Sequence, residues 1–510
     1  MSSTAPRMAH GVMTCARRLT SDQLSPVLAY RRLVAADDRL APSFLFESVE
    51  QGGQVGRFSL MGARPMLEVI AHGNAVTIRR RGQADEHRTV ANPLDVLREL
   101  TPLGAPVHHG PVPACFHGGW VGYCGFDAVR WLEPGKLPFS AAPRDDRDLP
   151  DLHMGLYGEV VVFDHVTKSM IVCASAPCHG DARDASLSRA LGVEIDRIVA
   201  ALEADSVRLQ PGRIDDDANA APVRPVSSST PPGAFRASVE HAKEYIRAGD
   251  AFQVVLSQRF ERTTTTDPFD LYRMLRVVNP SPYQAYLQAE GCILVASSPE
   301  ILCRVRGGVV TNRPLAGTRR RGRDEAEDAR LEAELLADAK ERAEHVMLVD
   351  LGRNARGRVS DLGSVQVKAC MDIERYSHVM HISSTLEGSL RPGLDAWDAL
   401  HAALPVGTVS GAPKVRAIQI IDELEPVRRG PYSGGLGCVG WNGDLDIALT
   451  LRTMVVPTAL HDAARGTWRV DLQAGAGVVL DSDPAAEEDE TVNKAAALGR
   501  AIELAERSFT

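Results

Sequence analysis

The feature that most constrains this chain is that its apolar, strand-like runs come in pairs separated only by a tight turn. Two such pairs are residues 67–71 with 75–79, and residues 301–305 with 309–311. A turn this short joins antiparallel strands, because parallel neighbours need a crossover of a dozen or more residues. Long amphipathic segments at 324–351 and 484–508 stand apart from the hairpins and are predicted to be helices. The pattern therefore favours an α+β fold with antiparallel sheets over a doubly wound parallel sheet.

A change in composition divides the chain. Residues 210–233 are rich in Pro, Ser and Asp and contain no aromatic residue, which is typical of a linker or an exposed loop. We therefore predict an N-terminal region at 1–210, a linker or exposed loop at 211–233, and a C-terminal region at 234–510. The 510 residues are enough for about two to four domains.

Composition excludes several classes of function. The formal net charge of −9 is spread along the chain, which does not indicate a nucleic-acid partner. No apolar stretch approaches the ~20 residues of a membrane span, and residues 1–20 lack the apolar core of a secretory signal. The nine cysteines include no CxxC pair, so free thiols in a reducing compartment are expected. These observations predict a soluble, cytoplasmic protein.

Two predicted helices carry paired glutamates. Glu341 and Glu344 lie three residues apart, with an apolar stripe on the other side of that helix, and Glu487 with Glu490 repeats the spacing. Asp483 and Pro484 before the second pair are typical of a helix start. Carboxylates supplied one or two per helix suit Mg²⁺. From spacing alone, solvated helix faces are the commoner explanation.

Other candidate residues are individually weak. Gly475-Ala476-Gly477 follows a strand-like run and could present backbone N–H groups to an anion, although a tight structural turn is the simpler interpretation. His381 lies inside an apolar run, where a core histidine is commoner than a catalyst. No GxSxG or Cys/His arrangement of a nucleophilic enzyme is present. The residues alone thus predict an α+β enzyme with a plausible Mg²⁺ and polyanion site.

An ordered series of longer motifs goes further. The C-terminal half contains, in order, 249–259 (GDAFQVVLSQR), 279–283 (NPSPY), 297–300 (SSPE), 314–319 (PLAGTR), 340–353, 374–381 (ERYSHVMH), 407–416, 473–477 and 490–494 (ETVNK). Shorter matches lie at 44–48, 56–59 and 118–123. With these motifs the chain resembles the chorismate-utilising enzymes, and most closely the large components of anthranilate synthases. The resemblance implies two antiparallel β-sheets packed as a sandwich with helices outside.

It also implies roles for the residues singled out above. Glu344 and Glu490 match direct Mg²⁺ ligands, and Glu341 and Glu487 match residues that hold water on the ion. Positions that bind the substrate carboxylates are matched by Thr408, Tyr432, Arg452, Lys494 and the backbone of Gly475, Ala476 and Gly477.

Two further residues match groups that move protons. Glu300 matches the general acid that protonates the departing C4 hydroxyl of chorismate while ammonia adds at C2. His381 matches the residue that assists loss of pyruvate and aromatisation.

Two positions separate the subfamilies. Isochorismate and salicylate synthases resembling this chain have Lys in place of Gln253, which activates water. Aminodeoxychorismate synthases of the covalent type have Lys in place of Ala316. The combination found here is that expected of an enzyme making anthranilate and pyruvate, the first step of tryptophan biosynthesis. The alternatives are an aminodeoxyisochorismate synthase, an aminodeoxychorismate synthase, or a non-catalytic subunit that binds chorismate or tryptophan.

The resemblance finally implies partners. Ammonia is expected from a separate glutamine amidotransferase subunit, which makes a hetero-oligomer. Feedback by tryptophan is expected at Glu47, Ser48, Pro282 and Gln284, where Gln284 replaces the usual Met. A second departure is Asn354-Ala355-Arg356, where the family usually has Asn-Asp-Leu.

Overall fold

The computed structural model describes residues 11–34, 41–48, 56–102, 106–178, 184–214, 227–376 and 379–509. Within these residues the strands form one sheet of 13 and one of 12 strands. In spatial order, the larger sheet contains β12 (Ser227–Ser228), β13 (Gln253–Thr264), β25 (Trp468–Val478), β24 (Thr453–Pro457), β15 (Cys292–Ser298), β14 (Tyr283–Ala289), β2 (Ser43–Glu47), β3 (Phe58–Ala63), β10 (Glu159–Asp164), β11 (Ser169–Cys178), β1 (Gly11–Thr20) and β7 (Val107–His109), with β21 (Gly411–Ala412) against β13.

The smaller sheet is built in the same way. It contains β18 (Leu315–Arg320), β20 (Val379–Ser389), β17 (Val309–Arg313), β16 (Ile301–Arg306), β23 (Leu445–Leu449), β22 (Gly435–Gly440), β8 (Gly119–Cys124), β9 (Leu152–Tyr157), β4 (Leu67–His72), β5 (Ala75–Arg80) and β6 (Glu86–Thr89), with β19 (Gln366–Arg375) against β20. The named strands pair antiparallel except for β7, which runs parallel to β1. The expected hairpins β4–β5 and β16–β17 are both confirmed.

The two sheets pack face to face. Their shared core combines Phe44 and Leu287 of the larger sheet with Val121, Tyr157 and Leu436 of the smaller one. Alternate side chains of each strand therefore point into this core, and the others point toward the helices. The α+β sandwich predicted from the sequence is confirmed.

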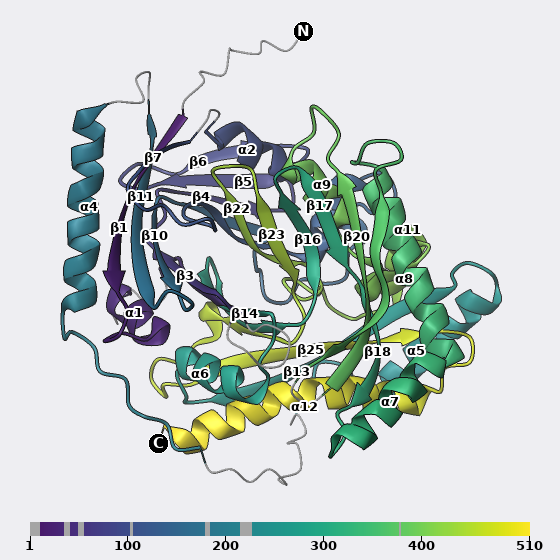
Figure 1. Cartoon of the computed structure of the whole chain (residues 1–510). Helices are drawn as coiled ribbons and strands as arrows, with labels where there is room; N and C mark the ends of the chain where they lie inside the picture. The colour runs from purple at the N-terminus through teal and green to yellow at the C-terminus, as the bar shows by residue number, and fades with distance from the viewer. Residues whose placement is uncertain are drawn as a thin grey trace.

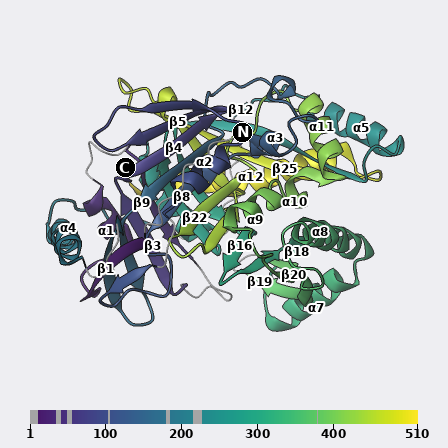
Figure 2. The same cartoon turned by 90° about the horizontal axis from the view of Figure 1, so that it is seen from above.

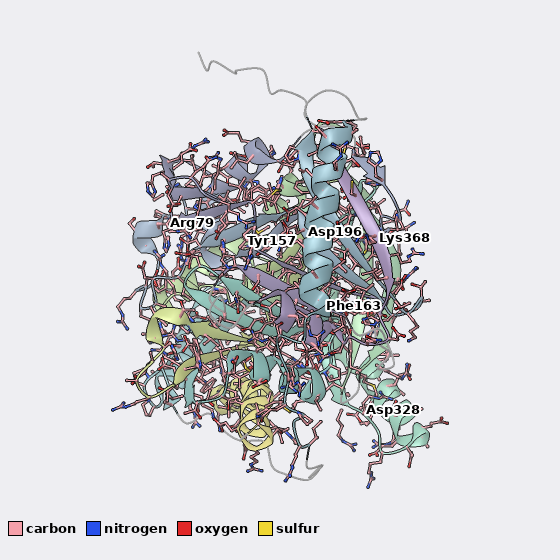
Figure 3. All side chains as sticks on the ribbon, turned by 90° about the vertical axis from the view of Figure 1, so that its left-hand side faces the viewer. Arg79, Tyr157, Phe163, Asp196, Asp328 and Lys368 are labelled. Atoms are coloured by element: carbon pink, nitrogen blue, oxygen red, sulfur yellow. The ribbon has the colours of Figure 1, made fainter. Side chains whose placement is uncertain are left out.

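Helices cover the outer faces. The helices of the described residues are α1 (Pro26–Leu33), α2 (Pro93–Leu100), α3 (Val129–Leu132), α4 (Ala185–Glu203), α5 (Ala234–Arg247), α6 (Pro268–Val278), α7 (Glu325–Ala337), α8 (Ala339–Gly357), α9 (Ala396–Ala403), α10 (Gly407–Ser410), α11 (Lys414–Leu424) and α12 (Pro484–Ser508). Figure 1 shows α12 and α6 along the lower face of the larger sheet. Figure 1 shows α4 beside β1 and β11, at the opposite side of the molecule from α8, and Figure 3 shows this helix, which carries Asp196, facing the viewer.

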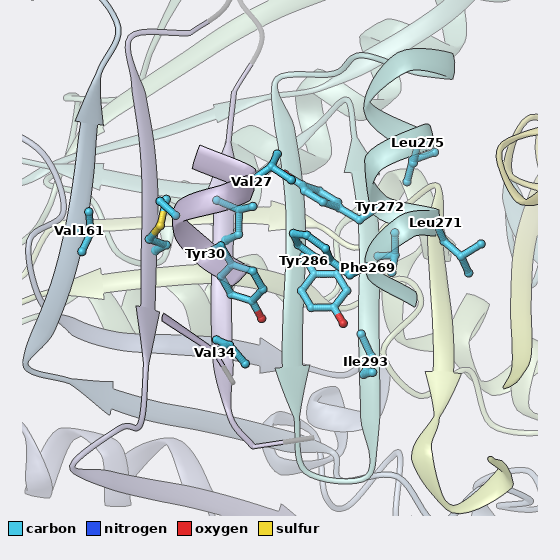
Figure 4. Packing of buried hydrophobic residues seen from close by; sticks show 14 of the residues in the cluster. Val27, Tyr30, Val34, Val161, Phe269, Leu271, Tyr272, Leu275, Tyr286 and Ile293 are labelled. Carbon is cyan, nitrogen blue, oxygen red and sulfur yellow. The ribbon is translucent and has the colours of Figure 1, made fainter. Parts of the chain in front are cut away.

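An aromatic cluster joins α1 and α6 to the larger sheet. The rings of Tyr30 and Phe269 stack with centroids 5.2 Å apart, and Phe269 meets Tyr286 edge-on at 5.1 Å. Figure 4 shows these rings between the two helices and strand β14. Buried aromatic contacts of this kind hold an element firmly, because each ring removes a large apolar area from water. They fix α6 beside the end of β2, where Glu47 lies.

The predicted helix at 324–351 is wrong in one respect. The segment forms two helices, α7 and α8, that break at Asp338, whose side chain accepts hydrogen bonds from the backbone N–H groups of Lys340 and Glu341. An aspartate that caps a helix from the preceding position competes with helix continuation, which explains the break. Figure 2 shows α7 and α8 together beside β18 and β20. The helix predicted at 484–508 is confirmed, with Asp483 as its N-cap.

The expected burial of α8 is also wrong. Val346 of the apolar stripe is 53% exposed, whereas Glu344 is half-buried and its neighbours His345 and Leu348 are buried. The helix therefore turns its glutamates inward, which an amphipathic pattern does not predict.

The division at 211–233 stays a prediction about sequence regions. Residues 215–226 of that segment lie outside the described residues. In the structure both sheets contain strands from both sides of it: β2 pairs with β14, and β8 pairs with β22. No helix in the described ranges has the length and hydropathy needed to cross a bilayer.

Candidate functional site

Glu300 occupies the short connection between β15 and β16. Its carboxyl is 2% exposed, and its Oε1 accepts a hydrogen bond from the Thr408 hydroxyl at 3.0 Å. Burial raises the pKa of Glu300 to about 8, because a charged carboxylate loses its hydration there; the bond from Thr408 opposes this effect. At neutral pH this side chain therefore carries a proton, which is the state that a general acid needs.

The glutamates of α8 and α12 converge from two directions. Gln253 donates from Nε2 to Glu344 Oε1 at 3.1 Å. Burial raises the pKa of Glu344; the bond from Gln253 lowers it, and the charges of Glu341 and Glu490 raise it further. Burial and the charge of Glu490 likewise raise the pKa of Glu487, against a hydrogen bond from Ser482. Like charges that disfavour one another in this way are relieved by a cation.

Two cations of the chain partly relieve this cluster. Lys494 Nζ lies 2.6 Å from Glu490 Oε1 and donates to the carbonyl of Gly475 at 3.0 Å. Arg319 Nη1 lies 3.3 Å from Glu341 Oε1. Glu344 forms no ion pair with any residue that the structure describes.

The donor set fits a hard divalent ion. Carboxylate oxygens are the ligands that Mg²⁺ prefers, and the ion offsets the repulsion between neighbouring carboxylates. Across the described ranges no three acidic, histidine or cysteine side chains are already drawn into coordinating positions. The fit therefore rests on donor chemistry and repulsion, not on a closed coordination shell.

His381 lies on β20 beside an irregular part of β18. The pairing of these strands shifts between Ala316 and Thr318, and Gly317 takes a φ of 68°, a conformation that favours glycine. His381 Nδ1 lies 3.0 Å from the Gly317 carbonyl and 3.1 Å from the Thr318 hydroxyl. The carbonyl can only accept, so Nδ1 carries the proton and Nε2 keeps its lone pair.

The electrostatics of His381 agree with this assignment. Burial, followed by the nearby positive charge of Arg452, lowers the pKa of His381 to about 4. The imidazole is therefore neutral at physiological pH. Ala316 precedes Gly317 in β18 and is 9% exposed, so no amine side chain reaches toward the site from this position.

Arg452 and Tyr432 have the surroundings of anion-binding groups. Arg452 sits at a φ of 45°, and burial lowers its pKa. Its Nη1 meets only the Asn279 amide oxygen, at 3.5 Å, and no carboxylate pairs with it in the described part of the chain. Tyr432 is 5% exposed, and burial raises its pKa to about 12. A desolvated guanidinium without an acid suits a ligand carboxylate.

The glycine motif lies in a strand, so the tight-turn interpretation is wrong. Gly475, Ala476 and Gly477 belong to β25 and pair with β13. A Cβ at Gly475 would lie 3.2 Å from the Tyr432 hydroxyl, and one at Gly477 would lie 2.6 Å from Gln253 Nε2. Because β24 pairs with β25 only at residues 471–472, the edge of residues 475–477 that points away from β13 faces no strand within the described residues. It can therefore still present backbone N–H groups to an anion.

A second site lies between the two sheets. Glu47, Ser48, Pro282 and Gln284 line one cavity of about 1020 Å³. The Glu47 carboxylate already has partners, because the Tyr272 hydroxyl donates to Oε2 at 2.6 Å and the guanidinium of the neighbouring α6 arginine lies 2.7 Å from the same oxygen. The structure thus brings the four predicted effector residues together, separately from the glutamate cluster.

A buried ion pair beneath the site was missed from the sequence. Arg429 is 2% exposed and binds Glu425 through Nε at 2.9 Å and Nη2 at 2.6 Å. The same guanidinium donates to the carbonyls of Val409 at 2.6 Å and Val255 at 2.7 Å. It therefore ties α10, next to Thr408, to β13. The sequence offers only two adjacent arginines, which is typical of a surface turn.

Comparisons with known proteins agree on one family. Residues 41–500 match the model of the chorismate binding enzyme family. The chain is 53% identical over 514 residues to "Anthranilate synthase alpha subunit 1, chloroplastic" of Arabidopsis thaliana, covering 97% of this chain and 86% of that protein. It is 41% identical over 505 residues to "Anthranilate synthase component 1" of Acetivibrio thermocellus, covering 97% and 96%.

Solved structures agree as well. Anthranilate synthase component I from Streptococcus pneumoniae matches with a TM-score of 0.71 and 35% identity, covering 94% of this chain and 99% of that one. The menaquinone-specific isochorismate synthase from Escherichia coli shares the fold, with a TM-score of 0.67 at 18% identity over 98% and 96% of the two chains. Together with the glutamate cluster and the neutral Glu300, these matches show that the chain belongs to the chorismate-binding enzyme family, among the component I or alpha subunits of anthranilate synthase.

Proposed function

We propose that the protein converts chorismate and ammonia to anthranilate, pyruvate and water. The observation that carries this proposal is the buried pair Glu300 and His381, whose pKa values of about 8 and about 4 favour a neutral acid and a neutral base, in a chain similar to anthranilate synthases over nearly its whole length. Gln253 and Ala316 support the same choice, because neither supplies the lysine amine that the water-adding and covalent subfamilies use.

Glu300 and His381 account for the two steps. As the ammonia nitrogen bonds to C2, both ring double bonds shift by one position, from C1=C2 and C5=C6 to C1=C6 and C4=C5, and the C4–O bond breaks. Glu300 gives its proton to the departing hydroxyl to form water, and the proton lost from the new ammonium group restores the acid. In the second step His381 Nε2 accepts the C2 proton while the C3–O bond breaks. The ring becomes aromatic, and the released enolpyruvyl group takes up a proton to become pyruvate.

Arg452, Tyr432, Thr408, Lys494 and the 475–477 backbone hold the two carboxylates of the substrate in this proposal. Glu344 and Glu490 would bind Mg²⁺ directly, and Glu341 and Glu487 would bind it through water. Once bound, the ion neutralises a substrate carboxylate and the repulsion within the glutamate cluster. Gln253 keeps the Glu344 carboxylate oriented by its hydrogen bond of 3.1 Å.

Two partners complete the proposal. A glutamine amidotransferase subunit would supply ammonia in a hetero-oligomer. Tryptophan would bind in the cavity lined by Glu47, Ser48, Pro282 and Gln284 and inhibit the reaction. The carboxylate of Glu47 would supply a partner for the amino group of the ligand.

Product analysis tests the proposal. The purified chain is given chorismate, Mg²⁺ and an ammonium salt, and anthranilate and pyruvate are quantified together. Equimolar anthranilate and pyruvate are expected, and a chelator should stop both. Accumulation of aminodeoxyisochorismate without pyruvate would instead identify an enzyme that stops after amination. Unchanged chorismate would support a non-catalytic binding subunit.

A further inference from the structure

A chain of side chains connects the cavity between the sheets with His381. The ring of Tyr376 meets the imidazole of His381 edge-on, with centroids 5.8 Å apart and planes at 61°. Its hydroxyl donates to Glu374 Oε2 at 2.7 Å. Arg313 forms an ion pair with the same carboxylate oxygen of Glu374.

Strand pairing and the partners of the Glu374 carboxylate hold this arrangement in place. In the pairing of β19 with β20, Glu374 lies directly opposite His381. Glu374 is 3% exposed, so its carboxylate depends on Arg313 and the Tyr376 hydroxyl for its charge and hydrogen bonds. A buried carboxylate shared in this way cannot move without moving its two partners.

The other end of the chain of contacts reaches the effector cavity. Arg313 and Tyr376 both line the same cavity of about 1020 Å³ as Glu47 and Gln284. Any molecule that fills this cavity therefore touches groups that bear on the imidazole. None of these groups belongs to the glutamate cluster.

We propose that Tyr376 is a positioning residue for His381, and that Arg313 and Glu374 make this positioning depend on what occupies the cavity. The inference rests on the proposed function, since it assigns the cavity an inhibitory ligand and His381 the elimination step. A ligand that prefers a different placement of Arg313 would turn Tyr376 through Glu374 and displace the imidazole. Inhibition would then fall on the loss of pyruvate, and not only on substrate binding.

The variant that tests this is Tyr376→Phe, which keeps the ring beside His381 and removes the bond to Glu374. We expect kcat for anthranilate to fall roughly tenfold, the scale of one hydrogen bond to a charged group, with little change in the KM for chorismate. Aminodeoxyisochorismate should accumulate, because amination does not use His381. L-tryptophan should still bind by calorimetry with its wild-type affinity, while its maximal inhibition of anthranilate formation weakens.

The matched control is Tyr283→Phe. Tyr283 lines the same cavity, and its hydroxyl donates to Asp446 at 3.0 Å and accepts from Arg304 at 2.7 Å, without contacting Glu374. This variant should leave the ratio of aminodeoxyisochorismate to anthranilate unchanged. Glu374→Gln gives a second test, since it keeps the shape of the side chain but removes the charge that holds Arg313; it should reproduce the accumulation and the weakened inhibition.

The outcomes separate the two proposals. If the unaltered protein makes no anthranilate, the proposed function is wrong. If it makes anthranilate but L-tryptophan neither binds nor inhibits, the cavity assignment is wrong. If it does both, and Tyr376→Phe and Glu374→Gln give the wild-type product ratio with full inhibition, the positioning role is wrong. A loss of rate without aminodeoxyisochorismate would also overturn it.

Discussion

The two sites of this protein differ in how far their charged side chains form ion pairs. In the cavity between the sheets most of the charged side chains form ion pairs, as in Glu47 with Arg276 and Arg313 with Glu374. At the catalytic centre neither Arg452 nor Glu344 forms an ion pair with a described residue, although the charge of Lys340 lowers the pKa of Glu344. A site whose charged side chains are already paired can form before its ligand binds. At the catalytic centre the charges of Arg452 and Glu344 are offset only when a charged ligand and a metal ion bind. The first suits a regulatory ligand and the second a charged substrate with its metal.

The largest expected effect on activity comes from replacing Glu300, the acid of the catalytic centre whose raised pKa keeps it protonated. Replacing Glu300 with Gln should lower kcat by about 10²–10⁴-fold, the usual contribution of a general acid, with a small change in KM. Steady-state anthranilate fluorescence measures this loss. Thr408→Val removes the hydrogen bond to Glu300 and also a hydroxyl proposed to bind a substrate carboxylate, so it should raise the KM for chorismate while costing much less in kcat. Wild-type turnover in Glu300→Gln would contradict the assignment.

The next largest effect is expected from removing the charge of Glu344, which Glu341 and Glu490 repel. Glu344→Gln should abolish the stimulation of turnover by Mg²⁺. It should also raise the thermal stability of the metal-free protein at neutral pH, because a carboxylate whose pKa is raised on folding opposes folding once it is ionised.

The sign of this stability effect can be checked against pH. A raised pKa favours the folded state at low pH, and this contribution is lost as pH rises from the ordinary glutamate value toward the folded one. The stability gain in Glu344→Gln should therefore shrink in acid. The matched control is Glu334→Gln on α7, whose carboxylate is 51% exposed beside Arg319. Equal effects from both variants would show that Glu344 is an ordinary surface acid.

A smaller effect is expected at Gln253. In Gln253→Lys the new amine faces Glu344 in place of the amide that now donates to it at 3.1 Å. Some addition of water to chorismate should follow, seen as isochorismate by chromatography, with anthranilate still the major product. Gln253→Met, which lacks an amine, should produce none. Failure of the lysine variant to form isochorismate would remove this explanation of the position without affecting Glu300.

The smallest effect is expected in the cavity. Gln284 is 4% exposed, and its Nε2 finds no partner among the described residues. Gln284→Met removes this unsatisfied buried donor, so it should stabilise the protein by about 1 kcal/mol. It should also tighten tryptophan binding a few-fold. Calorimetry and thermal unfolding measure both.

Gln288 in the same strand serves as the control for Gln284. Its Nε2 donates to the carbonyl of Ala41 at 2.6 Å, so Gln288→Met should destabilise the protein instead. A loss of stability in both variants would mean that the amide of Gln284 is satisfied in solution.

Local patterns predicted the parts of the fold that depend on local physics. The turn at 72–74 and the cap at Asp483 are set by their own residues, and both lie where expected. The break at Asp338 shows the limit, because the same cap preference that starts a helix can interrupt a longer amphipathic pattern. Both sheets contain strands from both halves of the chain. This arrangement depends on pairing between strands far apart in the sequence, which the pattern of local hairpins does not predict.

The site residues also include some that the sequence predicted and some that only the fold reveals. Spacing placed each glutamate pair on one helical face, but not that α8 turns that face inward. Resemblance supplied the roles of Glu300 and His381, whereas their protonation states follow from burial in the fold. Arg429 acts through partners far away in the sequence, such as Val255, so no local pattern identifies it. Tyr376 lies only five residues before His381, but the contact between their rings depends on how the chain turns between β19 and β20, which the motif does not state.

The pH dependence of anthranilate formation shows whether Glu300 acts as the general acid. The rate should fall as pH rises through about 8, because deprotonated Glu300 has no proton to give. Folding stability should decline over the same rise in pH from the ordinary glutamate range, and Glu300→Gln should abolish that part of the decline. A rate that stays constant well above pH 8, with the same stability profile in Glu300→Gln, would show that Glu300 is not the general acid.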